Sequence, residues 1–364
     1  MLTVLVVLPT AALFLRVLGD NSEHRSNTEL ERQGVEFLAA LGPLTTALAE
    51  KQASALQGVG AEPASLTAAV ARVQAADDDL GEDLGTRDRW AGLKDKIAKL
   101  QSVDGDAATI YEAHVEVSDL ALALYAAVRE NSTLNRDESS DIWFLQQAVA
   151  VDMPEAVTRV SRMGDTANMV AAAKARQKQA LLAQFGTESL LVRQAGDDLT
   201  DNLQAAANAT SSATLSGNLV TTLDAFRRGM EAANRGANFG GAPNVSALVT
   251  AQSTLQSALN ALSGVVLKEL DTLLSDRIDS LNYRRAESWG LLAVAIALIL
   301  VATYWTRVRA ADVRESLGRG DTGRDVSVQS DSRGSAYGGN PYDPAPAYGE
   351  IPNYGGRERS GALR

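Results

Sequence analysis

A polar stretch between two apolar helical segments carries the residue types best suited to holding a small molecule. Residues 131–141 are almost entirely polar, and Trp143 and Phe144 follow at once in a chain with only 5% aromatics. A Ser or Asp at the end of this stretch can cap the next helix, whose first backbone N–H groups favour an anion. The stretch predicts a ligand pocket. The alternative is a capped turn with Trp143 as a core anchor. The candidate ligand-binding residues are Asn131, Ser139, Asp141, Trp143, Arg159 and Arg162.

Two arginines lie one helix length beyond this stretch. Arg159 and Arg162 are three residues apart, so both lie on one face of a helix and could clamp a carboxylate in bidentate fashion. The alternative is salt bridging with neighbouring acids such as Glu155. Arg227 and Arg228 leave the same two alternatives open.

The residues that usually carry catalysis or metals are scarce. The chain has no cysteine, which excludes disulfides and thiolate metal sites, and it has only His24 and His114. Glu112 and Glu116 lie two residues either side of His114, on different helix faces. No phosphate-binding loop, dinucleotide fingerprint or nucleophile elbow occurs. We therefore expect no enzyme, no metal site and no cofactor.

Helical periodicity dominates the elements that must position these residues. Hydrophobic residues make up 45% of the chain, mostly Leu, Ala and Val, and no period-two run of any length predicts a strand. The sequence predicts an all-α fold. After a first helix from Asn27 to near Gly58, helices are expected over about residues 64–80, 86–100, 107–130, 141–162, 166–183, 188–206, 216–233 and 245–309.

Two apolar stripes lie on the first and last of these helices. Leu30–Leu48 repeats apolar residues or glycine at steps of four and three, with a local bend expected at Pro43. Leu255–Leu281 carries a second stripe with the same steps. We expect the two stripes to pack together.

The last helix continues into an uncharged run. Trp289–Trp305 holds seventeen residues, or roughly 26 Å of helix, with aromatic residues at both ends. Arginines follow with few acids, which by the positive-inside rule puts the C-terminal end in the cytoplasm. The sequence predicts a transmembrane helix over residues 287–306.

The two ends of the chain differ from its middle. Met1–Leu18 is apolar apart from Arg16, which indicates a first transmembrane helix, with a signal sequence as the alternative. Its shortness suggests that the natural start lies upstream. Residues 307–364 are rich in Gly, Ser, Pro and Tyr and are expected to form a disordered cytoplasmic tail. Residues 20–286 would form the extracytoplasmic bundle. This segment is acidic and the whole chain has a net charge of −11, which argues against nucleic acid as a partner.

Three separate stretches carry recognisable motifs. They are an entry helix, Glu29–Leu38 with Pro43-Leu44, a connector from Asn131 through Trp143-Phe144 to Met153-Pro154, and an exit helix, Leu270–Arg285. The order and spacing of these motifs resemble the helical-bundle sensor ectodomains of bacterial chemoreceptors, transmembrane histidine kinases and diguanylate cyclases. The resemblance covers roughly residues 30–309, although Asn135 and Arg136 stand where the family has Asp and Pro.

This resemblance implies an elongated double bundle, with two stacked four-helix modules sharing their long first and last helices, and it is compatible with a homodimer. Family members continue into a signalling domain, whereas only about 55 low-complexity residues follow here. We therefore expect a sensor-type protein of the bacterial plasma membrane without catalytic output. It would bind a small molecule or an envelope partner and signal through a separate protein. The alternative is a structural envelope protein whose bundle mediates oligomerisation.

Overall fold

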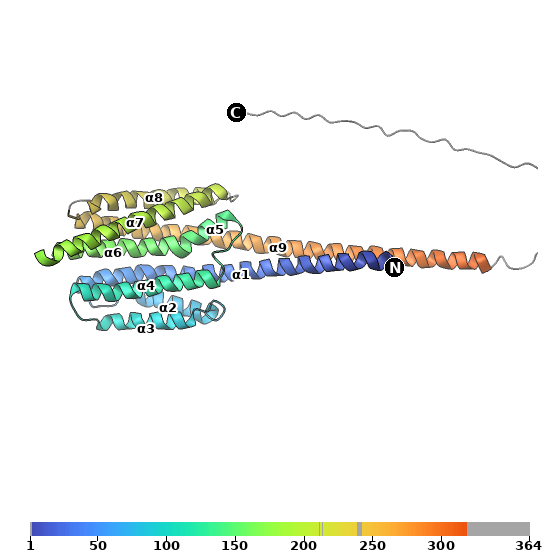
Figure 1. Cartoon of the computed structure of the whole chain (residues 1–364), viewed down its shortest axis with the longest axis horizontal. Coiled ribbons are helices and arrows are strands. Elements are labelled where there is room, and N and C mark those ends of the chain that lie inside the picture. Colours follow the sequence, from blue (N-terminus) through green and yellow to red (C-terminus); the bar gives the residue numbers. More distant parts are fainter. Residues whose placement is uncertain (1, 211, 213, 239–241, 319–364) are drawn as a thin grey trace, which may run out of the picture. The chain divides into compact units, whose positions relative to one another are not determined.

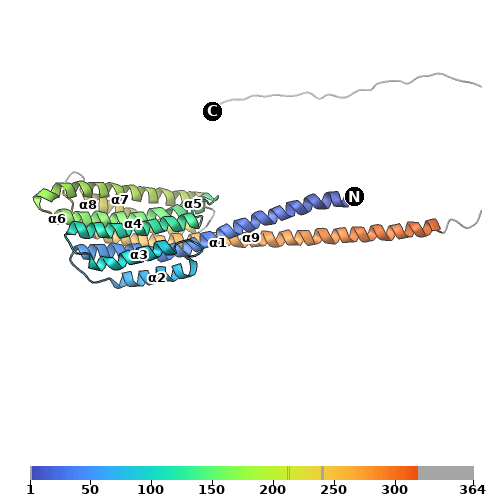
Figure 2. The same cartoon turned by 60° about the horizontal axis from the view of Figure 1, so that its bottom comes forward.

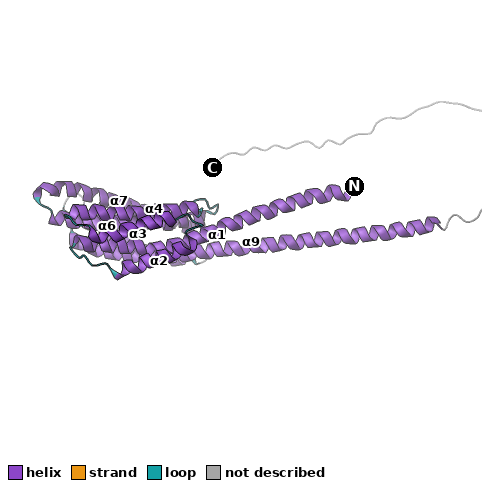
Figure 3. Ribbon diagram, turned by 90° about the horizontal axis from the view of Figure 1, so that it is seen from below, coloured by secondary structure: helices purple, strands orange, loops and turns teal. Residues whose placement is uncertain are grey.

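The computed structural model describes residues 2–210, 212, 214–238 and 242–318, and within these ranges the fold is all-α without a strand (Figures 1 and 3). The elements are α1 (Leu2–Leu56), α2 (Ala64–Leu80), α3 (Arg87–Lys99), a 3₁₀ turn (Leu100–Ser102), α4 (Ala107–Asn131), α5 (Ser140–Gln147), a π-helical turn (Ala148–Asp152), α6 (Met153–Ala172), α7 (Ala175–Ala209), α8 (Leu215–Ala237) and α9 (Val245–Gly318).

The first helix is longer than its apolar stripe. α1 runs without interruption from Leu2 to Leu56, so the apolar N-terminal stretch and the stripe form one helix that passes Pro43. The predicted end near Gly58 is confirmed, because Gly58 adopts a positive φ of 79° that favours glycine.

Two predicted helix breaks are wrong. Gly164 and Gly186 lie inside α6 and α7, and the break between these helices falls at Ala173 and Lys174. At Gly164 the side chain of Gln252 on α9 fills the space that a Cβ would need. Glycine there serves close packing of two helices, which periodicity alone does not distinguish from a helix end.

The described helices share one hydrophobic core. Helix α1 packs against α2, α4 and α6, while α7 packs against α5, α6 and α8. In Figures 1 and 2 the group α1–α4 lies alongside the group α6–α8, and α9 runs between them. This side-by-side arrangement does not confirm two stacked modules.

The predicted pairing of the two stripes is confirmed. Along α1 and α9 the contacts run in antiparallel order. Thr46 Oγ1 lies 3.2 Å from Asn260 Oδ1, Arg32 Nε lies 3.2 Å from Asp271 Oδ1, and Asn21 Nδ2 donates to the Leu281 carbonyl at 3.3 Å. Most stripe residues are fully buried: Phe37, Leu41, Leu44, Leu255, Leu262, Val266, Leu270 and Leu274.

The apolar parts of α1 and α9 leave the bundle at the same end (Figure 2). Phe14 and Trp289 meet there edge to face, with ring centroids 5.6 Å apart. Within the described residues, one helix, Val245–Arg309, is long and apolar enough to cross a membrane, and its apolar part is not buried in the protein.

The chain divides into two compact units, Met1–Ala297 and Leu298–Arg364. The first holds the bundle, and the described part of the second is the helical stretch 298–318. Residues 307–318, predicted as part of the tail, are therefore helical, and the rest of the predicted tail lies outside the described residues.

The buried stripe of α9 makes a direct prediction. Leu262→Asp places a charge in a seam where the leucine is fully buried, and it should lower the free energy of unfolding by at least about 3 kcal/mol. Val249→Asp on the same helix is the matched control, because Val249 is 51% exposed. Chemical denaturation of the full chain in detergent measures both. Equal effects of the two substitutions would contradict the packing.

Candidate functional site

The predicted residue Asn131 has a structural role. It ends α4, and its Nδ2 donates a hydrogen bond of 2.7 Å to the carbonyl of Leu84. That bond secures the turn between α2 and α3, where Gly85 has a φ of 59°. Asn131 therefore stabilises the packing of α4 against this turn.

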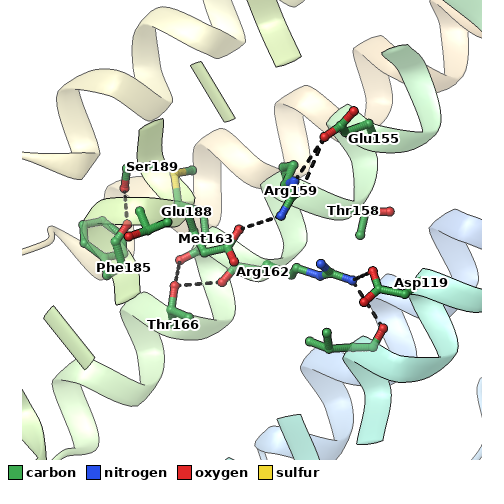
Figure 4. A network of polar contacts seen from close by, with 12 residues as sticks. Asp119, Glu155, Thr158, Arg159, Arg162, Met163, Thr166, Phe185, Glu188 and Ser189 are labelled. Carbon is green, nitrogen blue, oxygen red and sulfur yellow. Dashed lines mark hydrogen bonds and ion pairs between the residues drawn. The ribbon is translucent and has the colours of Figure 1, made fainter. Parts of the chain in front are cut away.

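The predicted arginines are also paired within the bundle (Figure 4). Arg159 Nε lies 3.4 Å from Glu155 Oε1, and its Nη1 lies 3.7 Å from Glu188 Oε2 on α7. Arg162 Nη2 donates to Asp119 Oδ1 on α4 at 2.6 Å. Both arginines thus form ion pairs of the kind that the alternative interpretation expects, and these pairs link α6 to α4 and α7.

The aromatic pair and the cap lie at the start of α5. Trp143 and Phe144 contact each other edge to face, with centroids 5.0 Å apart, and both are half-buried. Asp141 accepts a hydrogen bond from the backbone N–H of Ile142 at 2.9 Å. Ser139 is the N-cap residue, but its hydroxyl makes no capping bond because it accepts from Arg277 instead.

The contact between Ser139 and Arg277 belongs to a charged cluster that was not predicted from the sequence. Arg277 on α9 donates to both carboxylate oxygens of Asp137, at 2.5 and 2.9 Å, and to Ser139 Oγ at 2.9 Å. Glu31 on α1 approaches the same guanidinium, with Oε2 3.8 Å from Nη1. We call Glu31, Asp137, Ser139 and Arg277 the connector cluster. It joins α1, the loop 132–139 and α9 at the end of the bundle from which the apolar helices leave.

The loop is held against α1 by close packing at a glycine. A Cβ on Gly34 would overlap the Ser132 side chain and lie 2.9 Å from Leu134 Cδ1. Leu134 itself is fully buried. The glycine in the apolar stripe of α1 thus marks the place where the loop docks, which brings Asp137 within reach of α9.

The same loop carries unusual strain. Thr133 has a φ of 60°, a conformation that β-branched residues rarely adopt. Within the described residues, three buried polar atoms in or beside the loop lack a hydrogen-bond partner: Thr133 Oγ1, Asn135 Oδ1 and Glu31 Oε2. Strained backbone and unsatisfied polar groups each cost about 1–3 kcal/mol, and they concentrate at functional sites.

Burial controls the protonation of Glu31. Its side chain is 7% exposed, and this burial, together with the negative charge of Asp137, raises its pKa to about 8. Arg277 opposes the shift but does not cancel it, since its guanidinium is hydrogen-bonded to Asp137. Glu31 is therefore protonated at neutral pH.

A cavity of about 550 Å³ opens beside the cluster. Glu31, Asp137, Ser139 and Arg277 line it, as do other side chains of both helices, including His24 and Arg284. This volume is in the range of small-molecule sites.

No family model, curated protein or solved structure matches this chain. The connector cluster nevertheless unites parts of all three stretches on which the family resemblance rested: Glu31 from the entry helix, Asp137 and Ser139 from the connector, and Arg277 from the exit helix. The predicted pairing of the two stripes was the signal available in the sequence, because it brings Glu31 near Arg277, but nothing in the sequence placed Asp137 beside them.

A second polar region lies inside the bundle. Lys51, 2% exposed, donates to the carbonyls of Gly60 and Ala61 at 3.1 and 3.2 Å. Burial lowers the pKa of nearby His114 to about 4 and raises that of Asp165 to about 7. No group of three potential metal ligands occurs in the residues that the structure describes.

The raised pKa of Glu31 predicts a pH dependence of stability. A carboxyl whose pKa is raised on folding stabilises the protein below its unfolded value, and that contribution is lost as the pH rises toward about 8. Asp165 acts in the same direction up to about pH 7. His114 acts oppositely, but only below its unfolded value of 6.5.

Between about pH 7 and 8, where Glu31 is the main contributor, the free energy of unfolding should therefore fall by roughly 1 kcal/mol per pH unit. Glu31→Gln should flatten this slope, whereas Glu36→Gln, on the exposed face of the same helix, should leave it unchanged. Denaturant titrations of the full chain at several pH values provide the measurement. An identical slope in wild type and Glu31→Gln would refute the assignment.

Proposed function

We propose that this chain is a membrane-anchored, sensor-type protein without catalytic output of its own. Its bundle would lie outside the cytoplasm and bind a small molecule or an envelope partner. The resulting change would pass along α9 to a separate signalling protein. The observation that carries the proposal is the connector cluster, which ties both apolar helices to one strained loop at the point where they leave the bundle.

The location of the cluster supports a role in transmission. Arg277 lies twelve residues before Trp289, on the same uninterrupted helix, so displacement of its partners acts directly on the helix that leads away from the bundle. α9 contains no proline from Val245 to Gly318. A continuous helix can shift by 1–2 Å as a unit, as helices in allosteric proteins do.

The arrangement of charges in the cluster supports an exchange of partners by Arg277 rather than one permanent ion pair. One guanidinium faces two carboxyl groups, and it forms a bidentate pair with only one of them. A ligand that altered the charge of Glu31 would change which carboxylate Arg277 favours. Because the two carboxylates belong to α1 and to the loop, such an exchange would alter the register of α9 against its neighbours.

The proposed topology is tested with reporter fusions. A reporter active only in the cytoplasm, fused after Arg314, should give signal, and the same reporter inserted after Gly60 in the loop between α1 and α2 should not. A periplasmically active reporter at the same two positions is the control and should show the opposite pattern. The reverse result would overturn the proposed orientation.

The proposed transmission is tested with spin labels, which the absence of cysteine makes straightforward. Labels at the exposed positions Arg25→Cys and Glu287→Cys report the distance between α1 and α9 in the full chain. A compound or partner that raises the melting temperature should also shift this distance distribution. Arg277→Ala should abolish the shift while retaining binding.

The scaffold alternative makes a different prediction in the same experiment. If the bundle serves only oligomerisation, no compound or partner changes the distance between the labels, with Arg277 present or absent. That outcome would replace the sensor proposal by the structural one.

A further inference from the structure

One oxygen of the buried Glu31 carboxyl has no hydrogen-bond donor among the described residues. Its side chain is 7% exposed, lines the cavity beside the connector cluster, and has an Oε2 atom with no hydrogen bond to any described residue. A buried acceptor left in this state costs about 1–3 kcal/mol, and more when it is charged. A donor supplied from the cavity would remove that cost.

The neighbouring cation does not meet this need. Arg277 uses Nη1 and Nη2 on Asp137 and Nη2 again on Ser139, and its Nη1 stays 3.8 Å from Glu31 Oε2, beyond hydrogen-bond distance. The short bidentate contact with Asp137 occupies both Nη atoms of the guanidinium. In its protonated form Glu31 hydrogen-bonds to Asp137. Once ionised, it faces the cavity as an acceptor, and no donor among the described residues satisfies its Oε2 atom.

We propose that this cavity binds an organic ammonium group and that the Glu31 carboxylate is the acceptor that recognises it. A primary ammonium group carries a positive charge and up to three N–H donors, so it supplies both the charge and the hydrogen bond that Glu31 lacks. The volume of about 550 Å³ leaves room for the rest of a small molecule.

The remaining charges in the cavity favour this ligand class over anions and metal ions. Arg277 and Asp137 neutralise each other, which leaves three acids in the lining, Glu23, Glu31 and Glu138, against two arginines. A metal ion would need several ligands at once, and no such group occurs among the described residues. Arg136 and Arg284 line the same cavity and can accept an anionic group carried by the same molecule.

Protonation supplies an independent signature of such binding. Burial raises the pKa of Glu31 to about 8, so below that pH the vacant site holds a proton. An ammonium group that pairs with the ionised carboxylate must displace this proton. Other ionisable groups around Glu31 are His24 and Glu23 on α1, Arg136, Asp137 and Glu138 in the loop, Asp141 on α5, and Arg277 and Arg284 on α9.

The ammonium group could belong to a free amine or to a lipid headgroup. The second source rests on the proposed membrane location, because the adjoining surface pocket is lined by Val17, Leu18, Arg285 and Ser288, close to the apolar ends of α1 and α9. Both sources share a primary ammonium group, and ethanolamine is the simplest probe that carries it in the form found in the lipid headgroup.

Calorimetric titration of the full chain in phosphatidylcholine nanodiscs tests the inference with ethanolamine. Binding at about pH 6.5 should release close to one proton per site, measured by repeating the titration in buffers of different ionisation enthalpy. Choline, which has the charge but no N–H donor, should bind at least about tenfold more weakly.

Glu31→Gln should weaken ethanolamine binding by at least about tenfold and abolish the proton release, whereas Glu36→Gln should change neither. If Glu31→Gln fails to fold, the contrast between ethanolamine and choline and the proton release of the wild type still decide the matter. Ethanolamine and choline binding equally, without proton release, would overturn the assignment of Glu31.

The lipid source is distinguished by nanodiscs that contain phosphatidylethanolamine. Preferential retention of this lipid over phosphatidylcholine, lost in Glu31→Gln, would support the inference with a headgroup as ligand even if free ethanolamine binds weakly. Absence of binding in both arms would overturn it. A different compound that shifts the spin-label distance would then leave the proposed sensor function intact.

Discussion

The antiparallel packing of α1 against α9 is the constraint on which the remaining structure depends. Both helices bury an apolar stripe in the seam, and a buried stripe fixes the axial position of each helix to within a turn. That register places Arg32 opposite Asp271 and Glu31 near Arg277. It also brings the two apolar helix ends out of the bundle together, where Phe14 meets Trp289.

The loop 132–139 has a conformation that costs folding free energy, which packing elsewhere in the bundle must offset. Thr133 has a positive φ, and Glu31 is buried without a full hydrogen-bond partner. Replacing a buried ion cluster by apolar side chains is often neutral or stabilising, so such clusters are weak evidence for stability as their purpose. The position of the cluster where three chain segments meet is the basis of the proposed transmission along α9.

The buried ionisable groups respond to pH in opposite directions. Glu31 and Asp165 lose their stabilising effect as the pH rises, whereas His114 loses its effect as the pH falls. They lie in different parts of the bundle, the first at the end from which the apolar helices leave and the others in its interior. We therefore expect the pH dependence of stability to reflect local desolvation of these groups.

The sequence alone determined the helical class, most helix boundaries and the uncharged run after Trp289, because these follow from periodicity and composition within single segments. It also predicted the pairing of the two stripes, since two long apolar stripes must each be buried against another element. It did not distinguish a glycine that ends a helix from one that packs closely, as at Gly164, and it did not predict the contact of Arg159 with Glu188 on α7. Only the tertiary structure brought Glu31, Asp137 and Arg277 together. Desolvation and hydrogen bonding of a charged group depend on neighbours more than a hundred residues away, and no local pattern encodes that distance.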